Sequence, residues 1–161
     1  MKTRLFALYI IILCVSVGCK DDIPDQSLNG TLLCNMQCKY DSGEKTLHNF
    51  TSVDYSYDSD TKTLTLKHIN AGFNCCPDSL IAYFILSRNT LFINEIENNP
   101  KCNCNCLYDL NFIIEGVDPS TDSLWFIEPN IGTQNVLRFG IDLSNKKQGT
   151  VTLKRTQYPW N

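Results

Sequence analysis

The stretch that decides the fold is residues 102–115, which read Cys-Asn-Cys-Asn-Cys-Leu-Tyr-Asp-Leu-Asn-Phe-Ile-Ile-Glu. Every second residue from Cys102 is a cysteine or a large apolar residue, and the alternate set carries the polar side chains. Side chains of a β-strand alternate between two faces, so the pattern predicts one long strand whose cysteines face the core. The thirteen positions from Cys102 to Ile114 are many for one strand. We therefore expect a bulge or bend inside it.

The rest of the chain repeats short alternating runs that are separated by turn residues. Residues 52–58 alternate between polar and apolar positions, and the turn at 58–60 leads into a second run over 61–69, which predicts a hairpin. Residues 80–86 are apolar at nearly every position, which predicts a central strand that is covered on both faces. Further strands are expected over residues 90–97, 123–128, 135–143 and 150–156. The chain is therefore expected to be all-β, an antiparallel β sandwich of about eight or nine short strands.

Composition and charge narrow the function classes. The 161 residues are 43% hydrophobic and 19% charged, which suits one folded domain with a real core. Without Lys2 and Arg4, 12 of the 14 Lys and Arg remain against 17 Asp and Glu, a net charge of -5. Nucleic-acid binding needs a basic face, so we expect no nucleic-acid partner. No phosphate-binding loop, His-Glu-x-x-His or Gly-x-Ser-x-Gly motif occurs, so the chain is not expected to be an enzyme.

The first eighteen residues have the plan of a secretory signal-peptide helix. Lys2 and Arg4 precede the uncharged apolar run 5–17, which at thirteen residues is shorter than the roughly 20 that span a bilayer. The run closes on residues 16–19, Ser-Val-Gly-Cys, which resemble the lipobox of bacterial lipoproteins. That resemblance implies that Cys19 is the lipidated first residue of the mature chain. The alternative is an ordinary cleaved signal that leaves Cys19 as a free thiol.

The residues after Cys19 extend this resemblance. Lys20-Asp21-Asp22 is similar to the signal with which Bacteroidota lipoproteins reach the outer face of the outer membrane. It implies a lipid-anchored protein exposed at the cell surface. Residues 19–30 are polar and contain an Asn-Gly turn pair, which predicts a flexible tether. We expect residues 31–161 to form a single β-sandwich domain.

The cysteines are the main candidate constellation. Of nine, Cys14 lies in the leader and Cys19 at the anchor, which leaves seven in the domain: Cys34, Cys38, Cys75, Cys76, Cys102, Cys104 and Cys106. Export permits disulfides, and three bridges would leave one thiol. Residues two apart on a strand have Cα atoms ~6.6 Å apart and parallel side chains, a poor geometry for a bridge. We expect the segments of residues 34–38 and 75–76 to be bridged to residues 102–106, with Cys75 and Cys76 taking different partners because Pro77 follows them.

A thiolate metal site is the alternative to the bridges. Cys102, Cys104 and Cys106 could hold zinc or copper, with His48 or His68 as further ligands. The spacing lacks the paired Cys-x-x-Cys of structural zinc sites, so the main expectation is no cofactor. Reduced cysteines that act as small core residues are a third possibility.

Other candidate residues have simpler interpretations. His68 shares its strand parity with two leucines, which predicts a core or rim histidine, and Glu95 and Glu97 are expected on a solvated strand face. Aromatic side chains can stack on sugars, so a ligand platform is conceivable at three positions. These positions are Trp125, Tyr158 and Trp160.

Three segments together with the anchor carry a family resemblance. They are Asn74-Cys75-Cys76-Pro77-Asp78, the run over 102–109 and the ending Tyr158-Pro159-Trp160. With these segments the chain is similar to small cysteine-rich, uncharacterised lipoproteins of gut Bacteroidota. The resemblance implies an exported, lipid-anchored β domain and transfers no activity to particular residues.

Three function hypotheses follow. The first is a non-enzymatic cell-surface lipoprotein, stapled by disulfides, that presents a surface to a glycan or protein ligand. The second is a metal-thiolate protein that binds zinc or copper, and the third is a hydrolase whose groups converge only in the fold.

Overall fold

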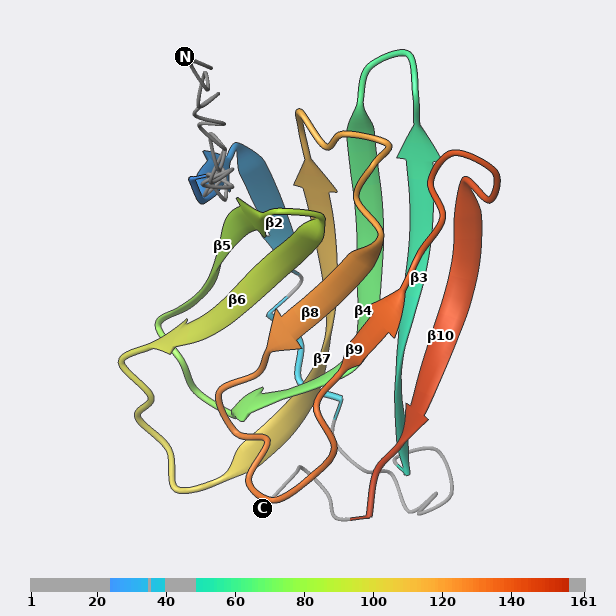
Figure 1. Ribbon diagram of the computed structural model, residues 1–161. Coiled ribbons are helices and arrows are strands. Elements are labelled where there is room, and N and C mark those ends of the chain that lie inside the picture. Colours follow the sequence, from blue (N-terminus) through green and yellow to red (C-terminus); the bar gives the residue numbers. More distant parts are fainter. Residues whose placement is uncertain (1–23, 35, 40–48, 157–161) are drawn as a thin grey trace, which may run out of the picture.

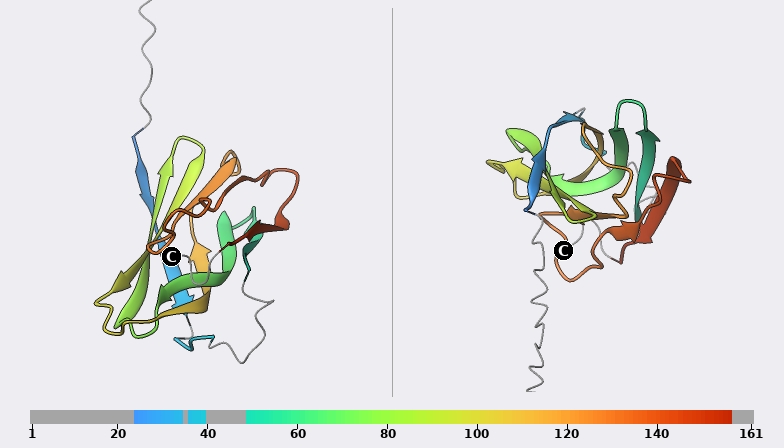
Figure 2. Two further views of the ribbon diagram at one scale, coloured as in Figure 1. Left: turned by 90° about the horizontal axis from the view of Figure 1, so that it is seen from below. Right: turned by 45° about the horizontal axis from the view of Figure 1, so that its top comes forward.

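The protein is a two-layered β sandwich. The computed structural model describes residues 24–34, 36–39 and 49–156, which form ten strands and contain no helix. One layer, here called sheet A, has the order β1 (Gln26–Leu28), β5 (Ser79–Ser87), β6 (Thr90–Asn98), β8 (Ser123–Ile127), β9 (Arg138–Gly140). The other, sheet B, has the order β10 (Gln148–Lys154), β3 (Phe50–Asp58), β4 (Thr63–Asn74), β7 (Asn105–Ile114), β2 (Gly30–Cys34). Sheet A lies in front of sheet B in Figure 1, and Figure 2 shows the same layers from two further directions. The all-β sandwich that the alternation predicts is therefore confirmed.

Strand pairing is antiparallel everywhere except between β6 and β8. These two strands run parallel, with Thr90 opposite Ser123 and Asn94 opposite Ile127. The chain leaves sheet A after β6, forms β7 in sheet B and returns to sheet A as β8. Two crossings between the layers bring β8 back in the direction of β6, so this one pair departs from the predicted antiparallel pattern.

The core lies between the two inner faces and follows the period of two. Sheet B contributes the inward residues Val53, Tyr55, Tyr57, Leu64, Leu66, Tyr108, Leu110, Phe112 and Ile114. Sheet A contributes Phe84, Leu91, Ile93, Leu124 and Phe126. Burying one such side chain stabilises the fold by roughly 1.5–3 kcal/mol. The predicted hairpin of residues 52–58 and 61–69 is present as β3 and β4.

The bulge expected inside residues 102–114 lies instead in the neighbouring strand β4. In the β4–β7 pairing the register shifts between His68 and Ala71, so that β4 carries one more residue than β7. Asn70 sits in this shift with a φ of 61°, a left-handed conformation that asparagine tolerates better than most residues. The shift changes the parity of β4, which lets His68 and Ala71 both face the core.

Several predicted boundaries are wrong. The strand expected from Cys102 begins at Asn105, because the bridges described below hold Cys102 and Cys104 outside the ladder. The strand expected over 135–143 is reduced to β9. Strand β1 lies within the range predicted as a tether and pairs with β5. The predicted signal peptide and Cys19 lie outside the described residues, among which no helix is long and apolar enough to cross a membrane.

Candidate functional site

One end of the sandwich is stapled by three disulfides. Cys38 is bonded to Cys106, Cys75 to Cys104 and Cys76 to Cys102, with Cα atoms 5.4–5.6 Å apart in each pair. All three bridges join the segment 102–106 to the segments that contain Cys38 and residues 75–76, as expected. A bridge of this kind contributes about 2–4 kcal/mol to folding. Cys102, Cys104 and Cys106 are therefore not thiolates in this state, and the described residues contain no group of three or more metal-ligating side chains.

The seventh cysteine, Cys34, is a free thiol on the edge strand β2. It lies opposite Leu110, half-buried against the core. Burial, and to a smaller extent the charge of Asp109, raises the pKa of this thiol. A raised pKa leaves little thiolate near neutral pH, so Cys34 is a poor nucleophile in the folded protein.

Strand β5 departs from its prediction in a way that creates a site. Residues 80–86 were expected to be covered on both faces, but only Leu80 and Phe84 are buried. Tyr83 is 55% exposed, Ile85 38% and Ile81 37%. None of the described elements covers the outer face of sheet A, since all the described strands lie in two layers. The apolar run therefore faces solvent on one side.

Neighbouring strands extend this exposed surface into a patch. Strand register places Phe92 beside Ile85, Trp125 beside Phe92, and Arg138 beside Trp125. The rings of Phe92 and Trp125 lie 5.3 Å apart, and the Arg138 guanidinium lies 4.7 Å from the Trp125 ring centre. We call the whole patch the apolar face. Its residues are Ile81, Tyr83, Ile85, Phe92, Asn94, Ile96, Trp125, Ile127 and Arg138.

The apolar face is almost without charge. Among the outward-facing residues of β1, β5, β6, β8 and β9, which the structure describes completely, Arg138 alone is charged. Cores of protein interfaces are similarly depleted of Lys, Asp and Glu and enriched in aromatic residues and Arg. The face is flat because it is one side of a sheet, and its rim of Ser, Thr and Asn supplies hydrogen-bonding groups. This composition is that of a docking surface.

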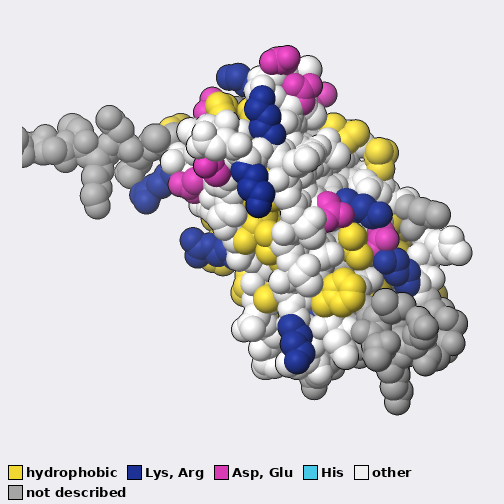
Figure 3. All heavy atoms as spheres, turned by 90° about the vertical axis from the view of Figure 1, so that its right-hand side faces the viewer, with side chains coloured by type: hydrophobic (Ala, Val, Ile, Leu, Met, Phe, Trp, Pro, Cys, Tyr) yellow, Lys and Arg dark blue, Asp and Glu magenta, His cyan; other side chains and the backbone are white. Residues whose placement is uncertain are grey.

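The outer face of sheet B has the opposite character, and we call it the polar face. Its outward residues include Ser52, Asp54, Ser56, Asp58, Thr63, Thr65, Lys67, Asp109, Asn111, Thr150, Thr152 and Lys154. Two exposed apolar residues, Leu33 and Ile113, interrupt it near β2. The neighbouring side of the molecule, where β10 forms the edge, shows basic and acidic side chains interspersed with scattered hydrophobic ones (Figure 3). Such mixed charge is typical of a solvated surface.

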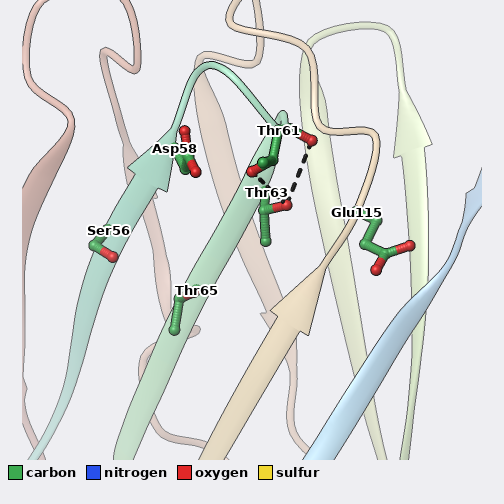
Figure 4. A pocket seen from close by; sticks show the side chains of 6 residues that line it. All are labelled: Ser56, Asp58, Thr61, Thr63, Thr65 and Glu115. Atoms are coloured by element: carbon green, nitrogen blue, oxygen red, sulfur yellow. Dashed lines mark hydrogen bonds between the residues drawn. The ribbon is translucent and has the colours of Figure 1, made fainter.

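A hollow of about 460 Å³ lies on the polar face beside the β3–β4 turn. Figure 4 shows its lining: Ser56, Asp58, Thr61, Thr63, Thr65 and Glu115. Its hydroxyls are partly used within the turn, where Thr61 donates to Thr63 at 3.0 Å, and Asp58 accepts from the Asp60 amide at 2.9 Å. Small-molecule sites are mostly apolar concavities. This polar hollow is therefore a weaker candidate than the apolar face.

A cluster of polar side chains that we call the buried seam crosses between the sheets. It consists of Thr51, His68, Glu95, Glu128 and Arg155, each at most 5% exposed. His68 Nδ1 lies 2.7 Å from Glu95 Oε1, and Arg155 binds both carboxylate oxygens of Glu128 at 2.6 Å. Buried charges persist only when they are paired. His68 on β4 of sheet B is paired with Glu95 on β6 of sheet A, and Arg155, which follows β10, is paired with Glu128, which follows β8.

The protonation of the seam follows from its hydrogen bonds. The Thr51 hydroxyl donates to the Ile69 carbonyl at 3.0 Å, so it accepts from His68 Nε2 at 2.8 Å. Burial alone lowers the pKa of His68, but the nearby carboxylates of Glu95 and Glu128 outweigh burial and raise it. Burial also raises the pKa of Glu95. The His68–Glu95 pair therefore holds one shared proton and is neutral as a unit.

The seam has the spacing of a hydroxyl–imidazole–carboxylate triad, but its setting is structural. In a hydrolase the hydroxyl must meet a substrate, whereas Thr51 and His68 are both 0% exposed. The prediction that His68 is a core or rim residue agrees with its burial. The prediction that Glu95 lies on a solvated face is wrong, because its strand parity points it inward at His68, and Glu97 is half-buried and accepts from the Asn74 amide.

Sequence reasoning found one member of the apolar face and missed most of it. Trp125 lies on the face as part of the predicted platform, while Tyr158 and Trp160 lie outside the described residues. Tyr83 and Phe92 were missed because an apolar run gives no sign of which face remains uncovered. No protein-family model, curated protein or solved structure matches the chain. The candidate site therefore rests on the geometry of the chain alone.

Proposed function

We propose that this protein is a lipid-anchored module of the cell envelope that binds a protein partner through the apolar face. The observation that carries the proposal is the exposed row of Ile85, Phe92, Trp125 and Arg138 with Tyr83 beside it. Aromatic residues and arginine dominate binding energy at protein interfaces. Sugar platforms also use aromatic rings, but the four isoleucines of this face offer no ring to stack on a sugar.

The chemistry of the partner follows from the charge of the face. Arg138 packs over Trp125 in a cation–π contact, which leaves its N–H groups at the edge of the patch. A guanidinium at the rim of an apolar interface pairs best with a carboxylate. The partner is therefore a protein that presents an apolar surface with an Asp or Glu at its edge.

The anchor is supported by the sequence around Cys19 and by the three bridges, since stable disulfides are typical of exported proteins. A module fixed to a membrane meets its partners in two dimensions. Modest affinity from one flat face is then sufficient for capture.

Site-specific photo-crosslinking tests the proposal in the cells that produce the protein. A benzophenone amino acid replaces Tyr83 on the apolar face or, as the matched control, exposed Thr65 on the polar face. We expect one discrete protein adduct from position 83 and none from position 65. Trp125→Ala should reduce the adduct at least tenfold, and Arg138→Glu should reduce it more than Arg138→Gln.

Three outcomes would contradict the proposed partner. They are equal adducts at both positions, an adduct between two copies of this chain, and binding to a glycan array without any protein adduct. The anchor is checked in the same preparation. Cys19→Ala should move the chain from the membrane fraction to the soluble fraction.

A further inference from the structure

We propose that the Cys75–Cys104 bridge is a thiol–disulfide exchange site through which an external thiol opens the Cys38–Cys106 bridge. Two of the three bridges touch: Cys75 Sγ lies 3.3 Å from Cys106 Sγ while it is bonded to Cys104. The Cys75 sulfur therefore lies within reach of two others: Cys104 Sγ, to which it is bonded, and Cys106 Sγ of the neighbouring bridge. This inference is independent of the apolar face and of the partner proposed for it.

The two touching bridges differ in their access to solvent. Cys104 is exposed, whereas Cys106 is 2% exposed and belongs to the core. Exchange requires a thiolate to reach a disulfide sulfur. An external thiol can attack Cys104, and the same thiol is excluded from Cys106.

The exchange runs in two balanced steps. In the first, the external thiolate bonds to Cys104 Sγ, the Cys75–Cys104 bond breaks, and the electron pair leaves on Cys75 as a thiolate. In the second, the Cys75 thiolate bonds to Cys106 Sγ, the Cys38–Cys106 bond breaks, and Cys38 leaves as a thiolate that takes up a proton. The number of disulfide bonds stays constant, so no oxidant is required.

The backbone keeps Cys75 in place after the first bond breaks. The Cys75 amide donates to the Cys104 carbonyl at 3.0 Å, and the Tyr108 hydroxyl lies 3.1 Å from the Cys75 carbonyl oxygen as a donor. The ladder between β4 and β7 pairs Phe73 with Cys106 just before Cys75. These contacts do not depend on the bridge, so the freed sulfur stays beside Cys106.

The product differs from the starting state at one place in the fold. The staple between Cys38 and β7 is open, and residues 36–39 are held there by the hydrogen bond from the Lys39 amide to the Leu107 carbonyl at 2.9 Å. A new Cys75–Cys106 bond joins the ends of β4 and β7, which already pair. An exposed sulfur, that of Cys104, thus controls a bridge in which Cys106 is buried and Cys38 is half-buried.

Limited exchange with glutathione tests the relay. The protein carries Cys34→Ser to remove the free thiol, receives glutathione without denaturant, and is quenched with an alkylating reagent. Tandem mass spectrometry then assigns each sulfur, including the three within residues 102–106. We expect glutathione on Cys104, alkylation of Cys38 and a Cys75–Cys106 bond, with at least tenfold less alkylation of Cys75.

Two results would overturn the relay. One is alkylated Cys75 with an intact Cys38–Cys106 bridge, which means that the second step does not occur. The other is a Cys104 that glutathione leaves unmodified. As a matched control, Cys38→Ser with Cys106→Ser removes the second bridge, and Cys75 should then become alkylated.

Discussion

The two outer faces of the sandwich are built on the same backbone plan but carry opposite side chains. On the apolar face the outward positions of β5 are Ile81, Tyr83 and Ile85, and Arg138 is the only charge among the outward residues of the described strands of that sheet. On the polar face the outward positions of β3 after Phe50 are polar, including Asp54 and Asp58. The inner faces of both sheets carry the buried apolar residues of the core. The difference therefore concerns what each sheet meets on its outside, and not how the fold is held together.

The contrast separates a surface with the composition of a solvated face from one with the composition of an interface. Scattered apolar residues occur on every protein surface, but a contiguous flat patch of aromatic and branched side chains marks an interaction site. The polar face shows that this chain readily places Ser, Thr and Asp on an uncovered sheet. Its failure to do so over β5, β6 and β8 is what points to a partner.

The largest expected effect on stability comes from breaking an ion pair of the buried seam, which joins the two sheets. Glu128→Ala leaves the buried Arg155 guanidinium without its carboxylate, which should lower the free energy of unfolding by about 3–5 kcal/mol. Urea denaturation at pH 7 measures it. Asp54→Ala on the polar face, which removes only an exposed contact to Thr150, is the control and should change stability by less than about 0.5 kcal/mol. Equal losses in the two variants would contradict the role of the seam.

A smaller effect is expected from pH. Because the pKa of His68 is raised on folding, the stability that its pairing provides is present below the unfolded pKa of about 6.5 and is lost as pH rises through the folded value. The raised pKa of Glu95 also makes the free energy of unfolding fall as pH rises. The other groups that face His68, which are Glu128, Arg155 and Thr51, are left unchanged in the variants compared.

Urea denaturation between pH 6 and 8.5 should therefore show the free energy of unfolding falling with pH. A Cys34→Ser background removes another group whose pKa is raised by burial. Replacing both titrating groups of the pair, in His68→Gln combined with Glu95→Gln, should flatten the dependence. A free energy that rises with pH over this range would show that the seam does not hold its shared proton.

The smallest effect on stability should come from making one outer face resemble the other. Tyr83→Thr combined with Ile127→Thr gives the apolar face the chemistry of the polar face at two positions that are 55% and 44% exposed. Since neither side chain supports the core, each change should alter the free energy of unfolding by no more than about 0.5 kcal/mol. Crosslinking from position 85 to the partner should nevertheless be lost. Loss of stability above 2 kcal/mol would mean that the face is part of the fold and not a docking surface.

The fold class could be predicted from the sequence because it depends on local periodicity. The alternation over 52–58 and from Cys106 to Ile114 specifies strands with one buried face, whatever else the chain does. The partners of the cysteines were constrained in the same way, since parallel side chains two residues apart on a strand cannot easily bond to each other. The three bridges run from residues 102–106 to other segments, in agreement with this constraint, and the structure leaves Cys34 as the free thiol.

Only the tertiary structure decided what lies outside each sheet and what crosses between them. The run over 80–86 reads as doubly buried because hydrophobicity records a preference for burial and not the presence of a covering layer. Glu95 reads as solvated because its partner His68 is 27 residues away in the sequence and meets it only through the packing of two sheets. Local pattern was enough to predict the strands and the segments that the bridges join. The apolar face, the buried seam and the contact between two bridges depend on distant segments meeting in space, which no local pattern encodes.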